Sequence, residues 1–175
     1  MMRNIIIVGL KGTNKAEIGK YLANSLKMQF IDTEEMMEKA SGLDLSELLK
    51  KIGEKQFRSL ENSTIEKISD LSGAVIVAGG GCILNRKNRE ILKKNGWIVN
   101  LVTSKIEIEE NKFKEETSRL LNQWNQVFQS AKGILNLKTP SFQAADTIIE
   151  VTDFSVEEIA QKIIKNYRRG GINLD

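Results

Sequence analysis

Four strongly apolar runs, rich in β-branched residues, recur along the chain and predict buried strands. They are NIIIVGL (4–10), AVIVAGG (74–80), WIVNLV (97–102) and DTIIEV (146–151), with MQFID (28–32) as a shorter fifth candidate. Each run is continuously apolar rather than alternating, which is typical of strands covered on both faces in a parallel sheet. We therefore expect a central parallel sheet of five strands.

Between these runs, apolar residues recur at helical spacing. The segment 15–27 places Ile18, Leu22 and Leu26 on one face. The segments 44–52 and 54–71 are similarly amphipathic, and in 155–167 Ser155 and Glu158 have the spacing of a capping box. The second of these segments turns four apolar residues inward: Phe57, Leu60, Ile65 and Ile68. Alternating strands and helices predict a three-layer α/β fold with helices on both sides of the sheet.

The 175 residues fit one domain, 1–175, because the sequence has no internal repeat, low-complexity tract or linker. Residues 109–138 are polar and weakly patterned, and we interpret them as a helical lid. The N-terminal apolar run is too short for a signal peptide or a membrane span. We therefore expect a cytoplasmic protein without a membrane partner, and a monomer, since no heptad or large apolar stripe is left over.

Composition narrows the chemistry. The chain has no histidine and a single cysteine, Cys82, so it lacks Ser-His and Cys-His nucleophile systems, His-ligated zinc and an internal disulfide. The net charge of +3 favours anionic ligands only weakly. One local basic cluster, 165–169, is better explained as a solvated helix end than as a nucleic-acid site, and we expect no nucleic-acid partner. Catalysis must rest on carboxylates, Lys, Arg, hydroxyls and backbone amides.

The stretch GLKGTNKA (9–16) resembles the phosphate-binding pattern G-x-x-x-x-G-K-[ST], with two positions changed. Lys15 is in place, but Asn14 stands at the second glycine and Ala16 at the hydroxyl that normally holds magnesium. A glycine-rich turn before a helix directs backbone N–H groups at phosphate oxygens. The alternative is an ordinary strand-to-helix turn with a surface lysine.

Acidic residues follow the short second strand in QFIDTEE (29–35). Asp32 falls at the strand end, where ligands gather in open α/β sheets, and its carboxylate is placed to face a magnesium ion with Glu34 directed at the same pocket. The alternative is that Asp32 or Thr33 caps the next helix. The two interpretations are compatible.

Two further segments indicate anion binding. In GEKQFRSLE (53–61), Arg58 offers a fork for a carboxylate and Glu61 has the spacing to hold it, although taken alone a surface ion pair is the simpler interpretation. Three consecutive glycines, Gly79, Gly80 and Gly81, follow a buried strand and predict a loop that a ligand approaches closely. Cys82 beside them is interpreted as a packed small residue, because no base is near it in the sequence.

Within the polar stretch, SRLL (118–121) supplies Arg119, which a closing lid can bring to a phosphoryl group undergoing transfer.

Together and in this order, these segments resemble shikimate kinases. FIDTE is similar to the family's F-[IL]-D-x-D, 53–61 to its GE-x-x-FR-x-x-E, 79–81 to its GGG, SRLL to its R-P-L-L without the proline, and LKTPSFQAAD to its R-x-P-L-Y-x-x-x-A-D. The resemblance covers nearly the whole chain. It implies a three-layer P-loop kinase fold with a helical substrate-binding segment at about 33–70 and a lid at about 109–125.

The resemblance also implies roles for individual residues. ATP would meet the loop and the lid: Gly12, Thr13, Asn14, Lys15, Ala16, Glu17 and Arg119. Shikimate, or a related carboxylic acid, would meet Asp32, Glu34, Arg58, Gly79, Gly80, Gly81 and Lys138. Lys15, Asp32 and Arg119 would be catalytic, with Asp32 supporting magnesium through water.

This chain departs from the family pattern at positions that touch the nucleotide or the acceptor. Ala16 lacks the magnesium-binding hydroxyl, and Asn14 replaces a glycine, although asparagine tolerates left-handed geometry. Glu34 is one methylene longer than the usual aspartate, and Lys138 keeps a charge but loses the arginine fork. The function implied is ATP-dependent phosphorylation of the shikimate 3-hydroxyl. A weak or non-catalytic relative and a kinase of a related hydroxylated acid are the alternatives.

Overall fold

Five parallel strands form the central sheet of the computed structural model, which describes residues 2–9, 12–103 and 144–170. The strands are β1 (Asn4–Gly9), β2 (Gln29–Asp32), β3 (Ala74–Gly79), β4 (Gly96–Val102) and β5 (Thr147–Glu150). Their spatial order is β2-β3-β1-β4-β5, and every neighbouring pair is parallel. All five predicted strands are confirmed, with ends that differ by at most one residue.

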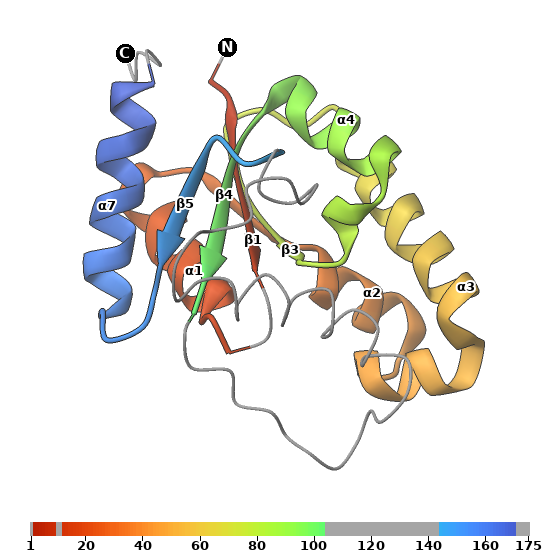
Figure 1. Ribbon diagram of the computed structural model, residues 1–175. Coiled ribbons are helices and arrows are strands. Elements are labelled where there is room, and N and C mark those ends of the chain that lie inside the picture. The colour runs from red at the N-terminus through yellow and green to blue at the C-terminus, as the bar shows by residue number, and fades with distance from the viewer. Residues whose placement is uncertain (1, 10–11, 104–143, 171–175) are drawn as a thin grey trace, which may run out of the picture.

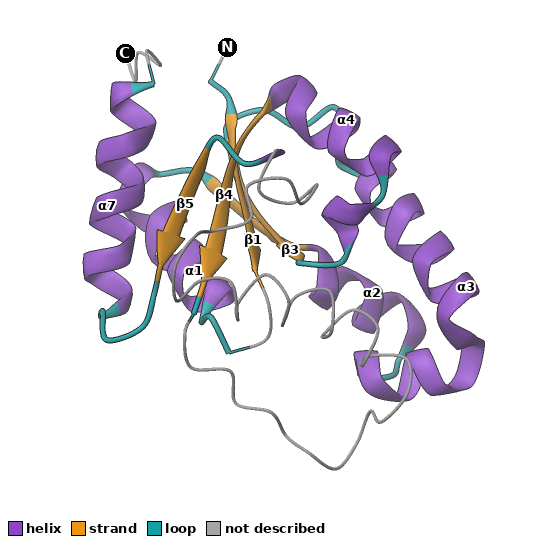
Figure 2. Ribbon diagram, in the orientation of Figure 1, coloured by secondary structure: helices purple, strands orange, loops and turns teal. Residues whose placement is uncertain are grey.

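Helices cover both faces of this sheet. They are α1 (Lys15–Leu26), α2 (Thr33–Ser41), α3 (Leu45–Lys67), α4 (Arg86–Asn95) and α7 (Val156–Arg169), with a short 3₁₀ turn, η1 (Cys82–Leu84). Helices α1 and α7 lie on one side of the sheet, and α3 and α4 lie on the other (Figure 1; Figure 2). The three-layer prediction is therefore confirmed.

Burial on both faces explains the continuous apolar pattern of the strands. Along β1, Ile5 and Ile7 pack into the cluster beneath α1 and α7, while Ile6 and Val8 pack into the cluster beneath α3 and α4. All four side chains are at most 1% exposed. Since successive residues of a strand point to opposite faces, a two-sided core requires an unbroken apolar run.

The helical region after β2 agrees with the sequence prediction of two helical segments, 44–52 and 54–71. Both lie mostly within α3, and the helical backbone is interrupted between them at Gly53, where φ is 77° and ψ is 163°. A side chain at Gly53 would meet no neighbouring atom, so backbone conformation rather than space requires glycine there. Met37, Leu48 and Phe57 form a small separate core between α2 and α3.

Two polar side chains connect neighbouring strands. The Asn4 amide donates to the Leu71 carbonyl at 2.7 Å and accepts from the Ala74 N–H at 2.9 Å, which ties the start of β1 to that of β3. Asp146 Oδ2 accepts from the Ile98 N–H at 2.7 Å and anchors the chain entering β5 to β4. None of the helices in the described ranges is long and apolar enough to cross a membrane.

Helix α1 approaches the sheet most closely at Gly19, which yields a stability prediction. A Cβ on Gly19 would lie 2.5 Å from Val77 Cγ2 and 2.9 Å from Phe30 Cε2. Gly19→Ala should therefore destabilise the fold by about 1–3 kcal/mol, because overpacking outweighs the gain in helix propensity. Urea unfolding measures the change, with Ser25→Ala on the exposed face of α1 as control; equal stability of the two variants would contradict this packing.

Candidate active site

The predicted phosphate loop joins the end of β1 to the start of α1. Gly12 has φ 92°, and Asn14 adopts the left-handed conformation, with φ 55° and ψ 27°, as the first residue before the helix. Asparagine thus takes the backbone geometry that favours glycine here, and its exposed side chain makes no cap hydrogen bond. Ala16 and the exposed Glu17 lie in the first turn of α1, where the helix N-terminus favours anions.

Lys15 forms an ion pair with Glu34 across this edge of the sheet. The distance from Lys15 Nζ to Glu34 Oε2 is 3.0 Å, and the two side chains are 11% and 33% exposed. Lys15 opens α1 and Glu34 lies in the first turn of α2, so the pair connects the phosphate loop with the segment after β2. The Lys15 ammonium is nearly buried and lies beside a helix N-terminus. It is therefore placed to bind an anion once its ion pair with Glu34 breaks.

Asp32, the last residue of β2, caps helix α2. Its Oδ1 accepts from the N–H groups of Glu34 and Glu35, at 2.9 and 3.2 Å. The capping alternative is therefore confirmed. Because only Oδ1 takes part in these two bonds, capping leaves Oδ2 for a further interaction, and it also fixes the first turn of α2 that carries Glu34.

Arg58 is held by Glu61 one turn further along α3. Arg58 Nη1 lies 3.1 Å from Glu61 Oε2 and 3.3 Å from Oε1. The pair is not the surface pair that the sequence alone favoured, because the Glu61 side chain is only 9% exposed. Burial raises the pKa of Glu61; the nearby Arg58 charge lowers the same pKa, and the Glu34 charge raises it further.

The three glycines after β3 make room for these side chains. A Cβ on Gly79 would lie 2.7 Å from Glu34 Oε1, and one on Gly81 would lie 2.7 Å from Arg58 Nη1. Neither glycine has a positive φ, so what marks these positions is the close approach of the Glu34 and Arg58 side-chain ends rather than the backbone conformation. Gly79, Gly81, Glu34, Arg58 and Glu61 thus form one cluster, which Lys15 joins through Glu34; Gly80 lies buried between the two other glycines.

Cys82 packs behind this cluster and is fully buried. Burial raises the pKa of its thiol well above the usual value, and the negative charges of Glu61 and Glu34 add to the effect. A thiol in this setting stays protonated and is a poor nucleophile. The interpretation of Cys82 as a packed small residue is confirmed.

The raised pKa of Glu61 predicts an unusual pH dependence of stability. A folded-state pKa above the unfolded one means that the folded chain binds the proton more tightly, so Glu61 destabilises the fold as pH rises from about 4 towards 7. In Glu61→Gln, the free energy of unfolding relative to wild type should therefore increase over that range. Chemical denaturation at several pH values measures it.

Glu158 provides the control of opposite sign. Its pKa is lowered by hydrogen bonds from the backbone and side chain of Ser155 in the capping box, so its stabilisation is present at neutral pH and is lost as pH falls. Glu158→Gln should lose stability relative to wild type as pH rises from about 3 to 5, the range in which a lowered pKa makes the folded chain release the proton first. The same trend in both variants would contradict the assignment of Glu61.

Several predicted site residues fall beyond the part of the chain that the structure describes. Arg119, Lys138 and the lid at about 109–125 lie outside the described residues. The predicted site residues that the structure does describe lie close together. They are at the carboxyl ends of β1, β2 and β3 or in α3 beside them: Lys15, Asp32, Glu34, Arg58 and the glycines 79–81. In the described ranges, no group of three or more His, Cys, Asp or Glu side chains is arranged to hold a metal ion.

Comparison with known proteins identifies the family. The sequence model of shikimate kinase matches residues 11–168. The chain belongs to the shikimate kinase family. A shikimate kinase of Thermodesulfovibrio yellowstonii is 38% identical over 168 residues, which is 96% of each chain. That of Caldanaerobacter subterraneus is 35% identical over 166 residues, 95% of this chain and 96% of the relative.

Solved structures agree with this membership. The shikimate kinase of Acinetobacter baumannii in complex with shikimate has a TM-score of 0.75 and 26% identity, and the match covers 99% of this chain and 97% of the other. The shikimate kinase of Aquifex aeolicus, 24% identical, has a TM-score of 0.72 and shares the fold, with coverage of 97% and 98%. The resemblance inferred from the motifs is confirmed.

Sequence reasoning missed features of the site that depend on three-dimensional contact. The Lys15–Glu34 pair joins residues 19 positions apart, and no periodicity signals it. Helix α4 was not predicted at all, because its ten residues include only two apolar ones, Ile91 and Leu92. The signal that marks the helix is Asn85, whose Oδ1 accepts from the N–H groups of Lys87 and Asn88 as an N-cap.

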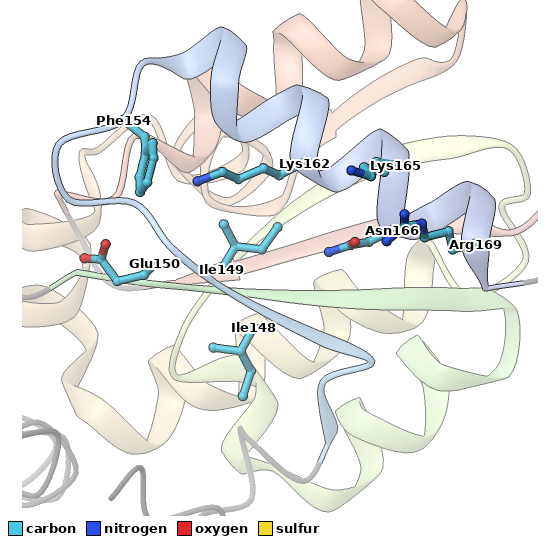
Figure 3. A pocket seen from close by; sticks show the side chains of 8 residues that line it. All are labelled: Ile148, Ile149, Glu150, Phe154, Lys162, Lys165, Asn166 and Arg169. Carbon is cyan, nitrogen blue, oxygen red and sulfur yellow. The ribbon is translucent and has the colours of Figure 1, made fainter. Parts of the chain in front are cut away.

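A hollow lies away from these residues, between β5 and α7 (Figure 3). It measures about 390 Å³ and is lined by Ile148, Ile149, Glu150, Phe154, Lys162, Lys165, Asn166 and Arg169. Strands β1 and β4 separate β5 from the strands that carry Asp32 and the glycines. Lysines beside an edge strand are a common protection against unwanted strand pairing. Tyr167, the aromatic residue of the basic cluster 165–169 on α7, is fully buried. It is therefore not exposed for stacking on a nucleic-acid base.

Proposed function

We propose that this protein transfers the γ-phosphoryl group of ATP to the 3-hydroxyl of shikimate. The observation that supports it most strongly is the convergence of a phosphate-loop lysine and a carboxylate-binding arginine at one sheet edge. Lys15 reaches Glu34, Glu34 lies against Gly79, and Arg58 lies against Gly81 of the same turn. Membership of the shikimate kinase family supplies the acceptor.

On the nucleotide side, the loop 12–15 and the N-terminus of α1 bind the phosphates. Lys15 exchanges Glu34 for the β- and γ-phosphate oxygens, because a phosphate carries more charge than a carboxylate and also meets the helix N-terminus. Arg119, outside the described residues, adds a second positive charge from the lid. Both cations stabilise the charge that spreads over the phosphoryl oxygens during transfer.

On the acceptor side, Arg58 binds the carboxylate of shikimate. Glu61 holds Nη1 of the guanidinium from the buried side, and the Arg58 side chain remains 33% exposed, so its outer edge faces the acceptor. Lys138, also outside the described residues, adds charge to the same carboxylate. Backbone groups of Gly79, Gly80 and Gly81 meet the hydroxyls, with Glu34 beside them.

The residues at the strand ends fit a divalent cation that arrives with the nucleotide. Ala16 offers no oxygen, and capping of α2 occupies one oxygen of Asp32, so Asp32 Oδ2 would hold the ion through water. Neutralisation of charge between the β- and γ-phosphates is what magnesium supplies when bound. The donor set therefore predicts an ion held mainly by the phosphates rather than by the protein.

The transfer itself needs little covalent help from the protein. The acceptor hydroxyl oxygen forms the new bond to the γ-phosphorus as the bond to the β–γ bridging oxygen breaks, which leaves ADP. The hydroxyl proton passes to a carboxylate at this edge. Glu34, which loses its partner when Lys15 turns to the phosphates, is the carboxylate nearest to Gly79, and Asp32 lies two residues before it in the chain.

A panel of acceptors tests the substrate assignment. ADP formation is followed with magnesium-ATP and shikimate, its carboxamide, or another hydroxylated acid such as quinate. We expect shikimate to be phosphorylated fastest, with the carboxamide at least about 10²-fold slower because Arg58 loses its partner. A faster reaction with a different acid would reassign the substrate and leave the kinase chemistry in place.

The altered loop yields a further prediction. Asn14→Gly with Ala16→Ser restores the family's glycine and hydroxyl, and we expect kcat/KM for magnesium-ATP to rise by about 10-fold or more because the serine oxygen positions the ion. Ser25→Ala, at an exposed position in the last turn of the same helix, is the control. A double variant that is no faster would show that the loop does not limit the rate.

We place the reaction in the cytoplasm and propose a monomer as the active form.

A further inference from the structure

The acceptor cluster is built from two segments that are distant in the sequence. Helix α3 carries Arg58 and Glu61, and the turn after β3 carries Gly79–Gly81 and continues as η1. Arg58 Nη1 packs so closely on Gly81 that a single methyl group there would lie 2.7 Å away. The position of the guanidinium therefore depends on the spacing between α3 and the glycine turn, and some contact must fix that spacing.

One fully buried side chain bridges the two segments. Asn88, in the first turn of α4, donates from Nδ2 to Asn62 Oδ1 at 2.8 Å and to the Cys82 carbonyl at 3.1 Å. Asn62 follows Glu61 directly and lies one helical turn beyond Arg58. Cys82 follows Gly81 directly. The two acceptors of the Asn88 amide thus belong to residues that directly follow a member of the cluster, Glu61 on α3 and Gly81 on the glycine turn.

The hydrogen bonding of the Asn88 side chain shows how its orientation is set. Among the described residues, its buried Oδ1 has no hydrogen-bond partner, an arrangement that costs free energy. The orientation of the amide is set by its two acceptors, because both require the NH₂ group. Arg89 reinforces the same junction, with Nη1 donating to the carbonyls of Ile83 and Leu84 at 2.9 and 2.7 Å.

We propose that Asn88 is a positioning residue for the acceptor site: its amide holds α3 against the glycine turn and thereby aligns Arg58 with the acceptor carboxylate. The residue contacts no substrate and acts through Asn62 and Cys82. The proposal rests on the proposed function for its kinetic consequence, since it assumes an acid acceptor at Arg58. The bridging geometry itself does not depend on that function.

The kinetic test is Asn88→Asp, which keeps the shape and removes both donors. We expect KM for shikimate to rise by roughly 10- to 100-fold, with KM for ATP within about 2-fold of wild type. The preference for shikimate over its carboxamide should fall by a similar factor, because a displaced Arg58 no longer discriminates between them. Asn62→Ala, a milder change at a half-buried residue, should give a smaller shift in the same direction and covers the case that Asn88→Asp does not fold.

Asn95→Asp is the matched control. Asn95 lies on the same helix, and its Nδ2 donates at 3.4 Å to the Ser69 carbonyl, in the turn after α3 and far along the chain from Arg58. A purely structural role for Asn88 predicts that KM for shikimate and KM for ATP change together in Asn88→Asp, with the carboxamide ratio at its wild-type value. Equal changes in the two KM values, or a kcat loss in Asn88→Asp with unchanged acceptor KM, would overturn the proposal.

An activity-independent measurement separates this proposal from the proposed function. Hydrogen exchange of the 79–85 backbone, which includes the Leu84 N–H bonded to the Gly81 carbonyl, should accelerate in Asn88→Asp and stay at the wild-type rate in Asn95→Asp. If wild-type protein does not phosphorylate shikimate but the exchange differs in this way, the function is wrong and the bridge stands. If exchange is unchanged in Asn88→Asp, the bridge is wrong whatever the enzyme does.

Discussion

Replacing Lys15 by methionine should lower kcat for shikimate phosphorylation by on the order of 10³-fold or more. The ammonium is the cation that the described residues place at the start of α1, next to the predicted phosphates. Methionine keeps the length of the side chain and removes the charge that stabilises the transferring phosphoryl group. Steady-state rates of ADP formation with saturating ATP and shikimate measure the effect.

Lys20→Met is the matched control for this prediction. Lys20 lies on the same helix, is exposed, and its ammonium lies 5.7 Å from the centre of the Phe30 ring. We expect the rate of Lys20→Met to stay within about 2-fold of wild type, since the charge of an exposed lysine is screened by solvent and contributes little to phosphate binding. If both variants lose the same activity, Lys15 acts through the fold rather than on the phosphates.

The second large effect concerns the acceptor. Arg58→Lys should raise KM for shikimate on the order of 10²-fold while KM for ATP changes little, because a lysine keeps the charge and cannot bind Glu61 and a carboxylate at once with a planar fork. In wild type, Nη1 is already engaged by Glu61 at 3.1 Å. Initial rates over a range of shikimate concentrations at saturating ATP give the value.

A surface arginine provides the comparison for Arg58. Arg86 is exposed and pairs with Glu90 on α4 at 2.8 Å. Arg86→Lys should leave both KM values unchanged, because a surface ion pair contributes little and lies outside the site. An Arg58→Lys variant with unaltered acceptor KM would show that the carboxylate binds elsewhere.

Most of the fold could be predicted from the sequence because its signals are local. Each strand is covered on both faces, so an unbroken apolar run such as Ile5–Val8 marks it without knowledge of its neighbours. The capping box of α7 is equally local and is confirmed, with Ser155 and Glu158 bonded reciprocally. Helix α4 could not be found in this way. Most of its residues are polar or charged, and its two apolar residues, Ile91 and Leu92, are too few to form a helical pattern.

The candidate site could be predicted as a set of residues but not as an arrangement. Motif spacing identified Lys15, Asp32 and Arg58, whereas the bond between Lys15 and Glu34 depends on how β1 and β2 lie on either side of β3. The same holds for the glycines. The sequence predicted that a ligand approaches these glycines closely. The structure shows that Gly79 and Gly81 lie against the side chains of Glu34 and Arg58.

The most direct test of the account is the rate of ADP formation by wild-type protein with magnesium-ATP, with and without shikimate. We predict turnover that depends on shikimate, exceeds that of Lys15→Met by about 10³-fold, and yields a phosphate monoester of shikimate detectable by phosphorus NMR. Wild-type protein that hydrolyses or binds ATP without phosphorylating shikimate, at a rate no higher than that of Lys15→Met, would contradict it.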